Sequence, residues 1–264
     1  MPYPILDPAT GPDPRFHGLC ALTIMAKAPR PGKVKTRLSP PLTAQQAATI
    51  NVCFLQDTAR NLAEVAALTG RAAGLVSYTP IGEEGLFNNL LPDGFNLIPQ
   101  RGDNFGDRLH CTAQDVLAKG FSSVCLIDSD SPTVPAAAYV QAVQELQKPG
   151  NRIILGPTLD GGYYLIGLKI PHPEPFTEIS WSTASVADET RTRCLSTGIE
   201  VVELPLWYDV DDATTLRILI SEVLFNTSPT FTTMHGYPAE NTATFLAQTR
   251  SLFLPAFDAE AVLP

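Results

Sequence analysis

The sequence predicts one α/β domain built as a three-layer sandwich, with a mainly parallel central sheet between two layers of helices. Short apolar runs alternate along the chain with longer segments whose apolar residues recur at helical spacing. Strands that alternate with helices form right-handed βαβ units, which place the strands parallel in one sheet. The 264 residues, of which 44% are hydrophobic, suffice for one extended core.

The individual elements follow from these patterns and from turn and cap residues. The expected strands span residues 19–26, 73–78, 95–99, 124–127, 153–155, 163–168 and 201–204. The longest expected helix begins after Thr43, a residue favoured at N-caps, and ends at Gly70. Further helices are expected before Pro92, after Pro135, and at 105–119, 186–195, 213–224 and 239–250.

Both ends of the chain are expected to lie outside this domain, which we place at residues 18–225. Residues 1–17 contain five prolines and little apolar surface, so we expect a disordered arm. Residues 226–264 form a C-terminal extension to which we assign no chemistry. No apolar run approaches the roughly 18 residues of a membrane span, and prolines stand where a signal region would be apolar. The expected location is therefore the cytoplasm.

Charge is unevenly distributed along the chain. A net charge of −9 argues against a nucleic-acid or anionic-membrane partner, because both require a broad positive field. Five of the 18 basic residues nevertheless lie within 27–37, and no acidic residue occurs in 14–56. This local positive field suits a small polyanion such as a nucleotide phosphate.

The basic segment 27–37 directly follows the first expected strand and is a candidate phosphate-binding loop. It is not a P-loop, which would need a glycine at position 27 and a hydroxyl residue at 34, where this chain has Lys27 and Val34. Its backbone N–H groups and cations can still hold phosphate oxygens, and a solvated basic loop is the alternative. The candidate nucleotide-binding residues are Lys27, Gly32, Lys33, Lys35, Thr36 and Arg37.

Two aspartate pairs follow expected strands. Asp128 and Asp130 come directly after a buried strand, and residues two apart in an extended chain point the same way, so both carboxylates can face one cation. Asp209 and Asp211 repeat this spacing before a helix. Mg²⁺ and Mn²⁺ prefer oxygen ligands and bind through one or two carboxylates plus substrate phosphates. These four aspartates are the predicted metal ligands, with a turn or helix cap as the alternative for each pair.

Two further segments are candidates for ligand binding. Gly161 and Gly162, between two expected strands, permit positive φ or a close approach of a ligand, although a tight hairpin needs the same residues. Arg101 and Arg108 flank a helix start that can bind an anion, or that simply begins a helix. None of the four histidines lies in a catalytic or zinc-binding pattern, which argues against serine- and zinc-hydrolase classes.

Together these segments resemble a bacterial family of glycosyltransferase-A-like transferases of unassigned substrate, within the nucleotide-diphospho-sugar transferase superfamily. The resemblance covers about residues 19–224 in the same order. It is carried by Lys35-Thr36-Arg37-Leu38, Gly106-Asp107-Arg108-Leu109, Asp128-Ser129-Asp130-Ser131-Pro132, Asp160-Gly161-Gly162-Tyr163-Tyr164, Trp181-Ser182-Thr183 and Asp209-Val210-Asp211. The first of these is also similar to the nucleotide-binding loop of 2-phospholactate guanylyltransferase, and the layout resembles molybdenum-cofactor guanylyltransferases, although their multiple-glycine loop is missing here.

The resemblance implies a glycosyltransferase-A-like fold and a role for each motif. It implies catalytic roles for Asp128, Asp130 and Lys35, with Mg²⁺ or Mn²⁺ as the cofactor. The acceptor or sugar side is assigned to Asp160, Gly161, Gly162, Tyr163 and Trp181. Asp212 stands where the family commonly has threonine.

Three functions remain open at the level of sequence. The resemblance favours glycosyl transfer from a nucleotide sugar to a small-molecule acceptor. The basic loop favours nucleotidyl transfer from a nucleoside triphosphate with release of pyrophosphate. A non-catalytic nucleotide-sugar sensor is the third, because a fold fixes where a site lies and not its chemistry.

Overall fold

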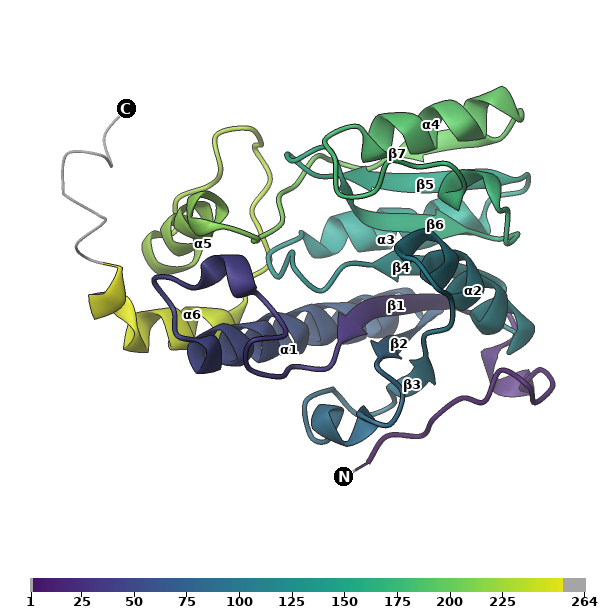
Figure 1. Cartoon of the computed structure of the whole chain (residues 1–264). Helices are drawn as coiled ribbons and strands as arrows, with labels where there is room; N and C mark the ends of the chain where they lie inside the picture. The colour runs from purple at the N-terminus through teal and green to yellow at the C-terminus, as the bar shows by residue number, and fades with distance from the viewer. Residues whose placement is uncertain (1, 254–264) are drawn as a thin grey trace.

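The computed structural model describes residues 2–253, which form a seven-stranded sheet with helices on both faces (Figure 1). The strands are β1 (Cys20–Lys27), β2 (Ala72–Thr79), β3 (Asn96–Pro99), β4 (Ser123–Ile127), β5 (Arg152–Pro157), β6 (Tyr163–Leu168) and β7 (Glu200–Glu203). The α-helices are α1 (Ala44–Thr69), α2 (Phe105–Ala118), α3 (Ala136–Gln147), α4 (Val186–Ser196), α5 (Ala213–Phe225) and α6 (Glu240–Gln248). The predicted α/β sandwich with a mainly parallel sheet is confirmed.

The sheet has the order β3-β2-β1-β4-β6-β5-β7, and β6 runs antiparallel to both of its neighbours. The pairs on either side of it are parallel, so β1, β4, β5 and β7 all end at one edge. Because β6 is reversed, it begins where β5 ends. The residues after β1, β4, β5 and β7, and the first residue of β6, therefore share the edge at which open α/β sheets bind ligands.

Alternating side chains of the strands build a core on each face of the sheet. Leu22 and Ile24 of β1 pack with residues of α1, α3, α5 and α6, whereas Ala21 packs on the other face with residues of α2 and α4. The long helix α1 has the predicted ends: Thr43 and Gln46 form a capping box, and Gly70 ends the helix in the left-handed conformation.

The N-terminal segment differs from the disordered arm that was expected. Leu6 and Phe16 are buried, and the Phe16 ring stacks on Phe121 with centroids 4.2 Å apart. The ammonium group of Lys119, itself buried, donates to the carbonyl oxygens of Thr10 and Gly11 and to the Thr10 hydroxyl. The prolines favour disorder, but the few apolar side chains of this segment are enough to order it, because they pack on the surface of the domain.

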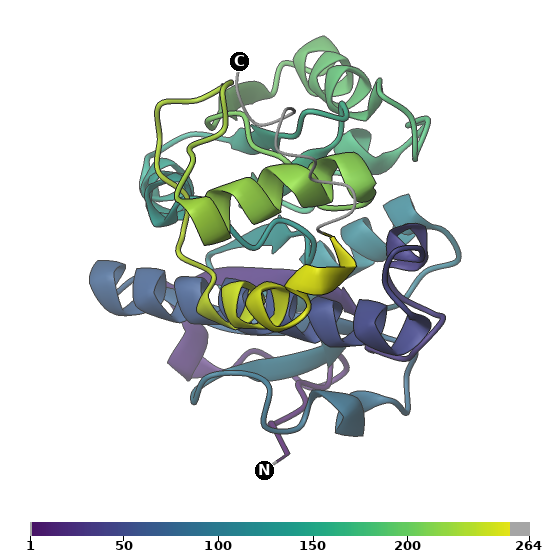
Figure 2. The same cartoon turned by 90° about the vertical axis from the view of Figure 1, so that its left-hand side faces the viewer.

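The segment after α5 is also part of the core. Helix α6 packs against α1 and α5 (Figure 2), and Phe245 and Leu246 are buried there. It has no side-chain cap of its own; instead the Asp57 carboxylate of α1 accepts hydrogen bonds from Asn241 N, Asn241 Nδ2 and Thr242 N at 3.0, 2.7 and 2.8 Å. This contact replaces a local N-cap and ties residues that the sequence placed in a separate extension to the main domain. Residues 254–264 lie outside the described part of the chain.

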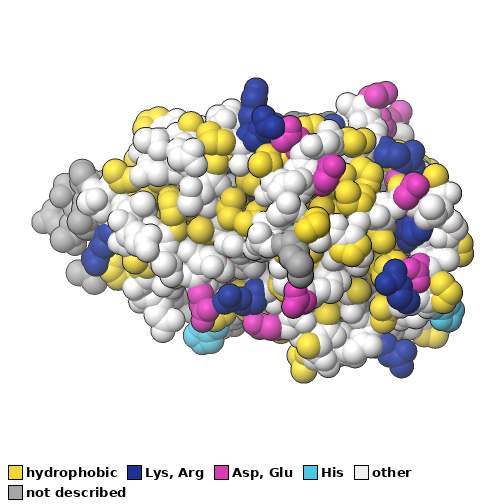
Figure 3. Space-filling model, turned by 90° about the horizontal axis from the view of Figure 1, so that it is seen from below, with side chains coloured by type: hydrophobic (Ala, Val, Ile, Leu, Met, Phe, Trp, Pro, Cys, Tyr) yellow, Lys and Arg dark blue, Asp and Glu magenta, His cyan; other side chains and the backbone are white. Residues whose placement is uncertain are grey.

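On the face seen in Figure 3, acidic and basic side chains are interspersed among apolar ones, and its described part carries no broad positive field, in line with the net charge of −9. None of the helices formed by residues 2–253 combines the length and apolar character needed to span a membrane.

The packing of the N-terminal segment can be tested by substitution. Phe16→Ala should lower the free energy of unfolding by about 3 kcal/mol, because it removes a buried ring and leaves a cavity. Ile5→Ala is the control: its side chain is 47% exposed, and the change should stay within about 0.5 kcal/mol. Urea denaturation of both variants measures this, and an unchanged midpoint for Phe16→Ala would mean that the segment does not pack on the domain in solution.

Candidate active site

Two adjoining cavities of different character lie at the carboxyl edge of the sheet. The basic cavity, of about 230 Å³, is lined by Lys27, Lys33, Val34, Lys35, Thr36, Arg37, Asn51, Ser129, Asp130 and Asp211. The acidic cavity, of about 340 Å³, is lined on its polar side by Arg37, Asp128, Asp130, Thr158, Asp160, Asp209 and Asp211, and by apolar and hydroxyl side chains elsewhere. Arg37, Asp130 and Asp211 border both.

Lys35 joins the basic loop to both aspartate pairs. Its side chain is 4% exposed, and its Nζ lies 2.8 Å from Asp130 Oδ1, 2.9 Å from Asp211 Oδ1 and 2.8 Å from the carbonyl oxygen of Val210. Burial on its own lowers the pKa of the Lys35 ammonium, but Asp130 and Asp211 outweigh it and raise the pKa above its usual value.

These contacts bear on the role predicted for Lys35. An ammonium group has three N–H donors, and here the protein supplies three acceptors. A direct contact with a phosphate would require Lys35 to release one of them. Lys35 also adopts a left-handed backbone conformation, with φ of 47°, which costs a non-glycine residue about 1–2 kcal/mol and which its contacts offset.

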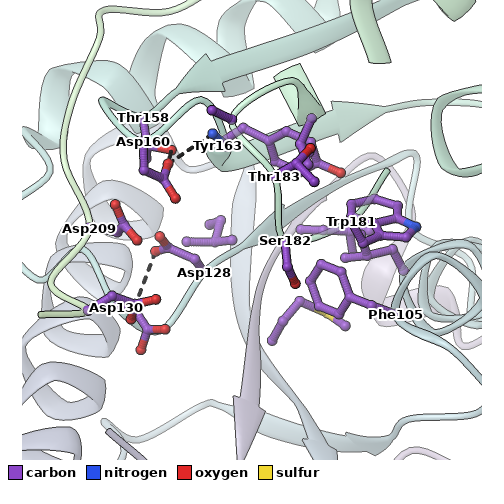
Figure 4. Close-up of a pocket in the computed structure, with 18 of the residues that line it drawn as sticks. Phe105, Asp128, Asp130, Thr158, Asp160, Tyr163, Trp181, Ser182, Thr183 and Asp209 are labelled. Atoms are coloured by element: carbon purple, nitrogen blue, oxygen red, sulfur yellow. Dashed lines mark hydrogen bonds between the residues drawn. The ribbon is translucent and has the colours of Figure 1, made fainter. Parts of the chain in front are cut away.

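Asp128 and Asp209 are the two predicted ligands that have no protein cation as a direct partner. Neither takes part in an ion pair among those of residues 2–253. Their carboxylates point toward one another in Figure 4. Burial, and next the charge of Asp130, raise the pKa of Asp128 well above its usual value. Burial, followed by Asp160 and Asp211, raises the pKa of Asp209 to about 7.

The carboxylates fit a divalent cation that shares its coordination with a ligand. Within residues 2–253, no three His, Cys, Asp or Glu side chains are arranged to hold a metal ion. The four predicted ligands thus do not form a closed metal site in the described part of the chain. Mg²⁺ and Mn²⁺ bind through one or two carboxylates and take their remaining oxygens from water and phosphate. Asp128 and Asp209 are the two of the four that make no ion pair within residues 2–253, because Lys35 engages Asp130 and Asp211.

The turn between β5 and β6 fixes Asp160 at the rim of the acidic cavity. Asp160 Oδ1 accepts hydrogen bonds from the Thr158 hydroxyl and Gly162 N at 2.6 and 2.9 Å. Gly161 has φ of 88°, and a Cβ there would collide with the carbonyl oxygen of Ala184. Gly161 therefore permits both the tight turn and the close approach of Ala184.

Aromatic residues form the opposite wall. Phe105 meets Trp181 edge to face, with centroids 5.0 Å apart, and Tyr163 meets Trp181 at 6.5 Å. Gly106 makes this approach possible, because a Cβ there would lie 2.5 Å from Phe176 O and 2.9 Å from Trp181 Nε1. Tyr163 and Trp181 are expected on the acceptor or sugar side, together with Asp160 and the two glycines, whereas Phe105 is not among the expected site residues. Its signal in the sequence was an aromatic residue at the first position of a helix that starts beyond the carboxyl end of a strand.

Three predicted phosphate-binding residues line neither cavity. Arg101 donates to both carboxylate oxygens of Asp115 at 2.7 and 2.6 Å, so it ties the preceding loop to α2. The guanidinium of Arg108 lies 5.9 Å from the Phe105 ring centroid, and Gly32 is exposed at the turn of the basic loop. Their contact with a nucleotide stays a prediction.

The Lys35 contacts predict a large effect on stability. Lys35→Met should lower the free energy of unfolding by about 2 kcal/mol, less than the roughly 3–5 kcal/mol of a fully buried pair, since the carboxylates are 33% and 43% exposed. Lys33→Met is the matched control, because Lys33 is exposed on the same loop and should change stability by under about 0.5 kcal/mol. Equal denaturation midpoints for the two variants would contradict the buried role of Lys35.

Comparisons with known proteins agree with the fold. The chain is similar to a provisionally named nucleotide-diphospho-sugar transferase from Desulfovibrio desulfuricans G20, at 29% identity and a TM-score of 0.74, over 89% of this chain and 97% of the other. The fold is shared with a CMP:2-keto-3-deoxy-manno-octonic acid synthetase complexed with CTP (13% identity, TM-score 0.52, 79% and 100% of the chains). It is also shared with a nucleotidyl transferase from Methanothermobacter (10% identity, TM-score 0.51, 79% and 99%).

No match is found among curated proteins. Residues 54–183 match the family model described as an uncharacterized protein conserved in bacteria, DUF2064. The resemblance drawn from the sequence is thus confirmed: residues 54–183 are similar to this bacterial family, and the fold of the chain is that of the nucleotide-diphospho-sugar transferases.

Proposed function

We propose that this protein is a metal-dependent transferase that moves a glycosyl group from a nucleotide sugar to a small-molecule acceptor. The observation that carries the proposal is the meeting of a basic and an acidic cavity at Arg37, Asp130 and Asp211. A nucleotide sugar fits this pair of cavities. Its diphosphate suits the basic cavity, and the hydroxyl groups of its neutral sugar can donate hydrogen bonds to the carboxylates of the acidic cavity.

The donor diphosphate is assigned to the basic cavity. Lys27 and Lys33 line it and take part in no ion pair among those of residues 2–253, so their charges are available to a ligand. Arg37 is 73% exposed and lies 3.6 Å from Asp211. It can therefore bridge the aspartates and a phosphate at the border of the two cavities.

Asp128 and Asp209 are the residues that would hold the cation. When bound, a divalent cation neutralises the charge that develops on the departing diphosphate. The charges of Lys27, Lys33 and Arg37 act on the same diphosphate from the opposite side.

The acidic cavity then holds the reacting centres. A bond forms between the acceptor oxygen and C1 of the sugar, and the bond from C1 to the phosphate oxygen breaks with its electron pair leaving on the diphosphate. The acceptor proton passes to a carboxylate. Asp160 is placed for this role because the Thr158 hydroxyl and the Gly162 amide fix its orientation through one oxygen, which leaves the other for the acceptor.

Nucleotidyl transfer is the second candidate, favoured by the number of cations in the basic cavity. Lys27, Lys33 and Arg37 can hold a third phosphate as well as two. In that reaction an acceptor oxygen attacks the α-phosphorus and pyrophosphate leaves. The synthetase of similar fold, complexed with CTP, is consistent with a nucleoside triphosphate in such a fold.

A thermal-shift screen separates the two candidates. With Mn²⁺ present, nucleotide sugars should raise the melting temperature more than the matching nucleoside triphosphates, and chelation of the metal should remove the effect. A ligand at 100 times its Kd adds about 2.7 kcal/mol to the free energy of unfolding. A larger shift with triphosphates would instead assign the protein to nucleotidyl transfer.

Substitution of the open aspartates tests the metal assignment. Asp128→Asn combined with Asp209→Asn should weaken Mn²⁺-dependent nucleotide binding by more than about 100-fold, beyond the 10- to 100-fold loss typical of residues that only support metal ligands. The empty protein should keep its melting temperature, because the change removes two carboxylates that repel one another. Asp188→Asn, on the exposed face of α4, is the control for calorimetry. Undiminished Mn²⁺ dependence in the double variant would reject the assignment.

A further inference from the structure

The acidic cavity has two unlike walls. Figure 4 shows the carboxylates of Asp128, Asp130, Asp160 and Asp209 on one side and the rings of Phe105 and Trp181 on the other. The assignment of a glycosyl group and an acceptor to this cavity leaves the aromatic wall without a function.

The charges around the cavity restrict what can enter it. Five aspartates and one arginine line it, and Lys35, which compensates two of the aspartates, faces the basic cavity. Arg37, Lys35 and a divalent cation together do not fully offset the five carboxylates, so the cavity keeps a negative charge. An acceptor that carries a phosphate or carboxylate would therefore be repelled, whereas an uncharged acceptor would not.

The aromatic wall is built to meet a ring. Phe105, the first residue of α2, is 43% exposed and lines the acidic cavity, so its ring is accessible to a ligand there. Gly106 and Gly161 let the segment around Trp181 approach α2 and the β5–β6 turn closely, so the wall is rigidly supported. Ser182, beside Trp181 on the cavity wall, has φ of 64°, and strained residues of this kind concentrate at ligand sites.

The position of the wall relative to the donor indicates which ligand it meets. In a nucleotide sugar the diphosphate separates the nucleoside from the sugar. With the diphosphate in the basic cavity and the sugar beside the carboxylates, the nucleoside extends away from the acidic cavity. The aromatic wall lies beyond the sugar, where the acceptor must approach.

We propose that Phe105 and Trp181 bind an uncharged ring of the acceptor, and that the acceptor is a neutral hydroxyl compound with an apolar or aromatic ring. This inference rests on the proposed glycosyl transfer and adds the class of the acceptor. Stacking of a ring on an aromatic side chain contributes about 1–3 kcal/mol, so the wall can dominate the selection of the acceptor.

Three probes that differ in ring and charge test the proposal: phenyl glucoside has a ring and no charge, phenyl phosphate has a ring and an anion, and glucose has neither. With Mn²⁺ and UDP, GDP, CDP or ADP present, calorimetry should give phenyl glucoside a Kd at least about 10-fold lower than either other probe, the equivalent of 1.4 kcal/mol. Quenching of Trp181 fluorescence should accompany binding, and Trp181→Phe should remove it.

Variants of the wall complete the test. Phe105→Ala and Trp181→Ala should each reduce the preference for phenyl glucoside over glucose by about 5-fold or more, within the range of a lost ring contact, and leave nucleoside diphosphate binding unchanged. Phe225→Ala is the matched control, since Phe225 is 52% exposed on α5 and lines neither cavity.

Equal affinity for phenyl phosphate and phenyl glucoside would overturn the inference while nucleotide binding, and with it the proposed function, stood. Weaker nucleotide binding in the two wall variants would also overturn it, because it would assign the rings to the base of the donor. Absence of any Mn²⁺-dependent nucleotide binding in the unaltered protein would instead count against the proposed function itself.

Discussion

The ion pairs of Lys35 are the interaction on which the site depends. Three segments far apart in the sequence meet at its ammonium group: the loop after β1, the loop after β4 at Asp130 and the β7–α5 loop at Asp211. A buried ammonium is costly unless it is paired and hydrogen-bonded, so its presence fixes the relative positions of all three. The candidate site follows from the sheet order, which brings these strand ends to one edge, and from Lys35, which holds the loops together there.

Lys35 also divides the charge of this edge between the two cavities. It pairs with both Asp130 and Asp211, and it leaves Asp128 and Asp209 without an ion pair in the described structure. The basic residues that face the other cavity belong to the same loop as Lys35. One loop thus supplies both the internal counter-ion of the aspartates and the positive surface for a phosphate ligand.

Sequence patterns predicted most of the fold because the local signals agree with the tertiary structure. Thr43 and Gly70 mark both ends of α1, and the aspartate pairs were expected at strand ends that the topology then brings together. The expectation of a disordered N-terminal arm does not match the structure, because Phe16 and Lys119 form contacts with partners distant in sequence.

Pairing between side chains was the part of the site that could not be predicted. Nothing local distinguishes Lys35, which is buried between carboxylates, from the exposed Lys33 two residues earlier. Arg101 likewise has a charge suited to phosphate, but its partner Asp115 lies 14 residues later in the sequence, within α2. The aromatic wall depends on Gly106 packing beneath Trp181, a contact between residues separated by three strands.

The central claim is that a cation at the open aspartates and a diphosphate on the basic loop bind as one unit. Calorimetric titration of Mn²⁺ with and without UDP, GDP, CDP or ADP tests this directly, because two coupled ligands must raise each other's affinity by the same factor. The account predicts weak Mn²⁺ binding to the protein alone and at least about 10-fold tighter binding with a nucleoside diphosphate present, a coupling of 1.4 kcal/mol. The same Mn²⁺ affinity with and without every nucleotide would contradict it.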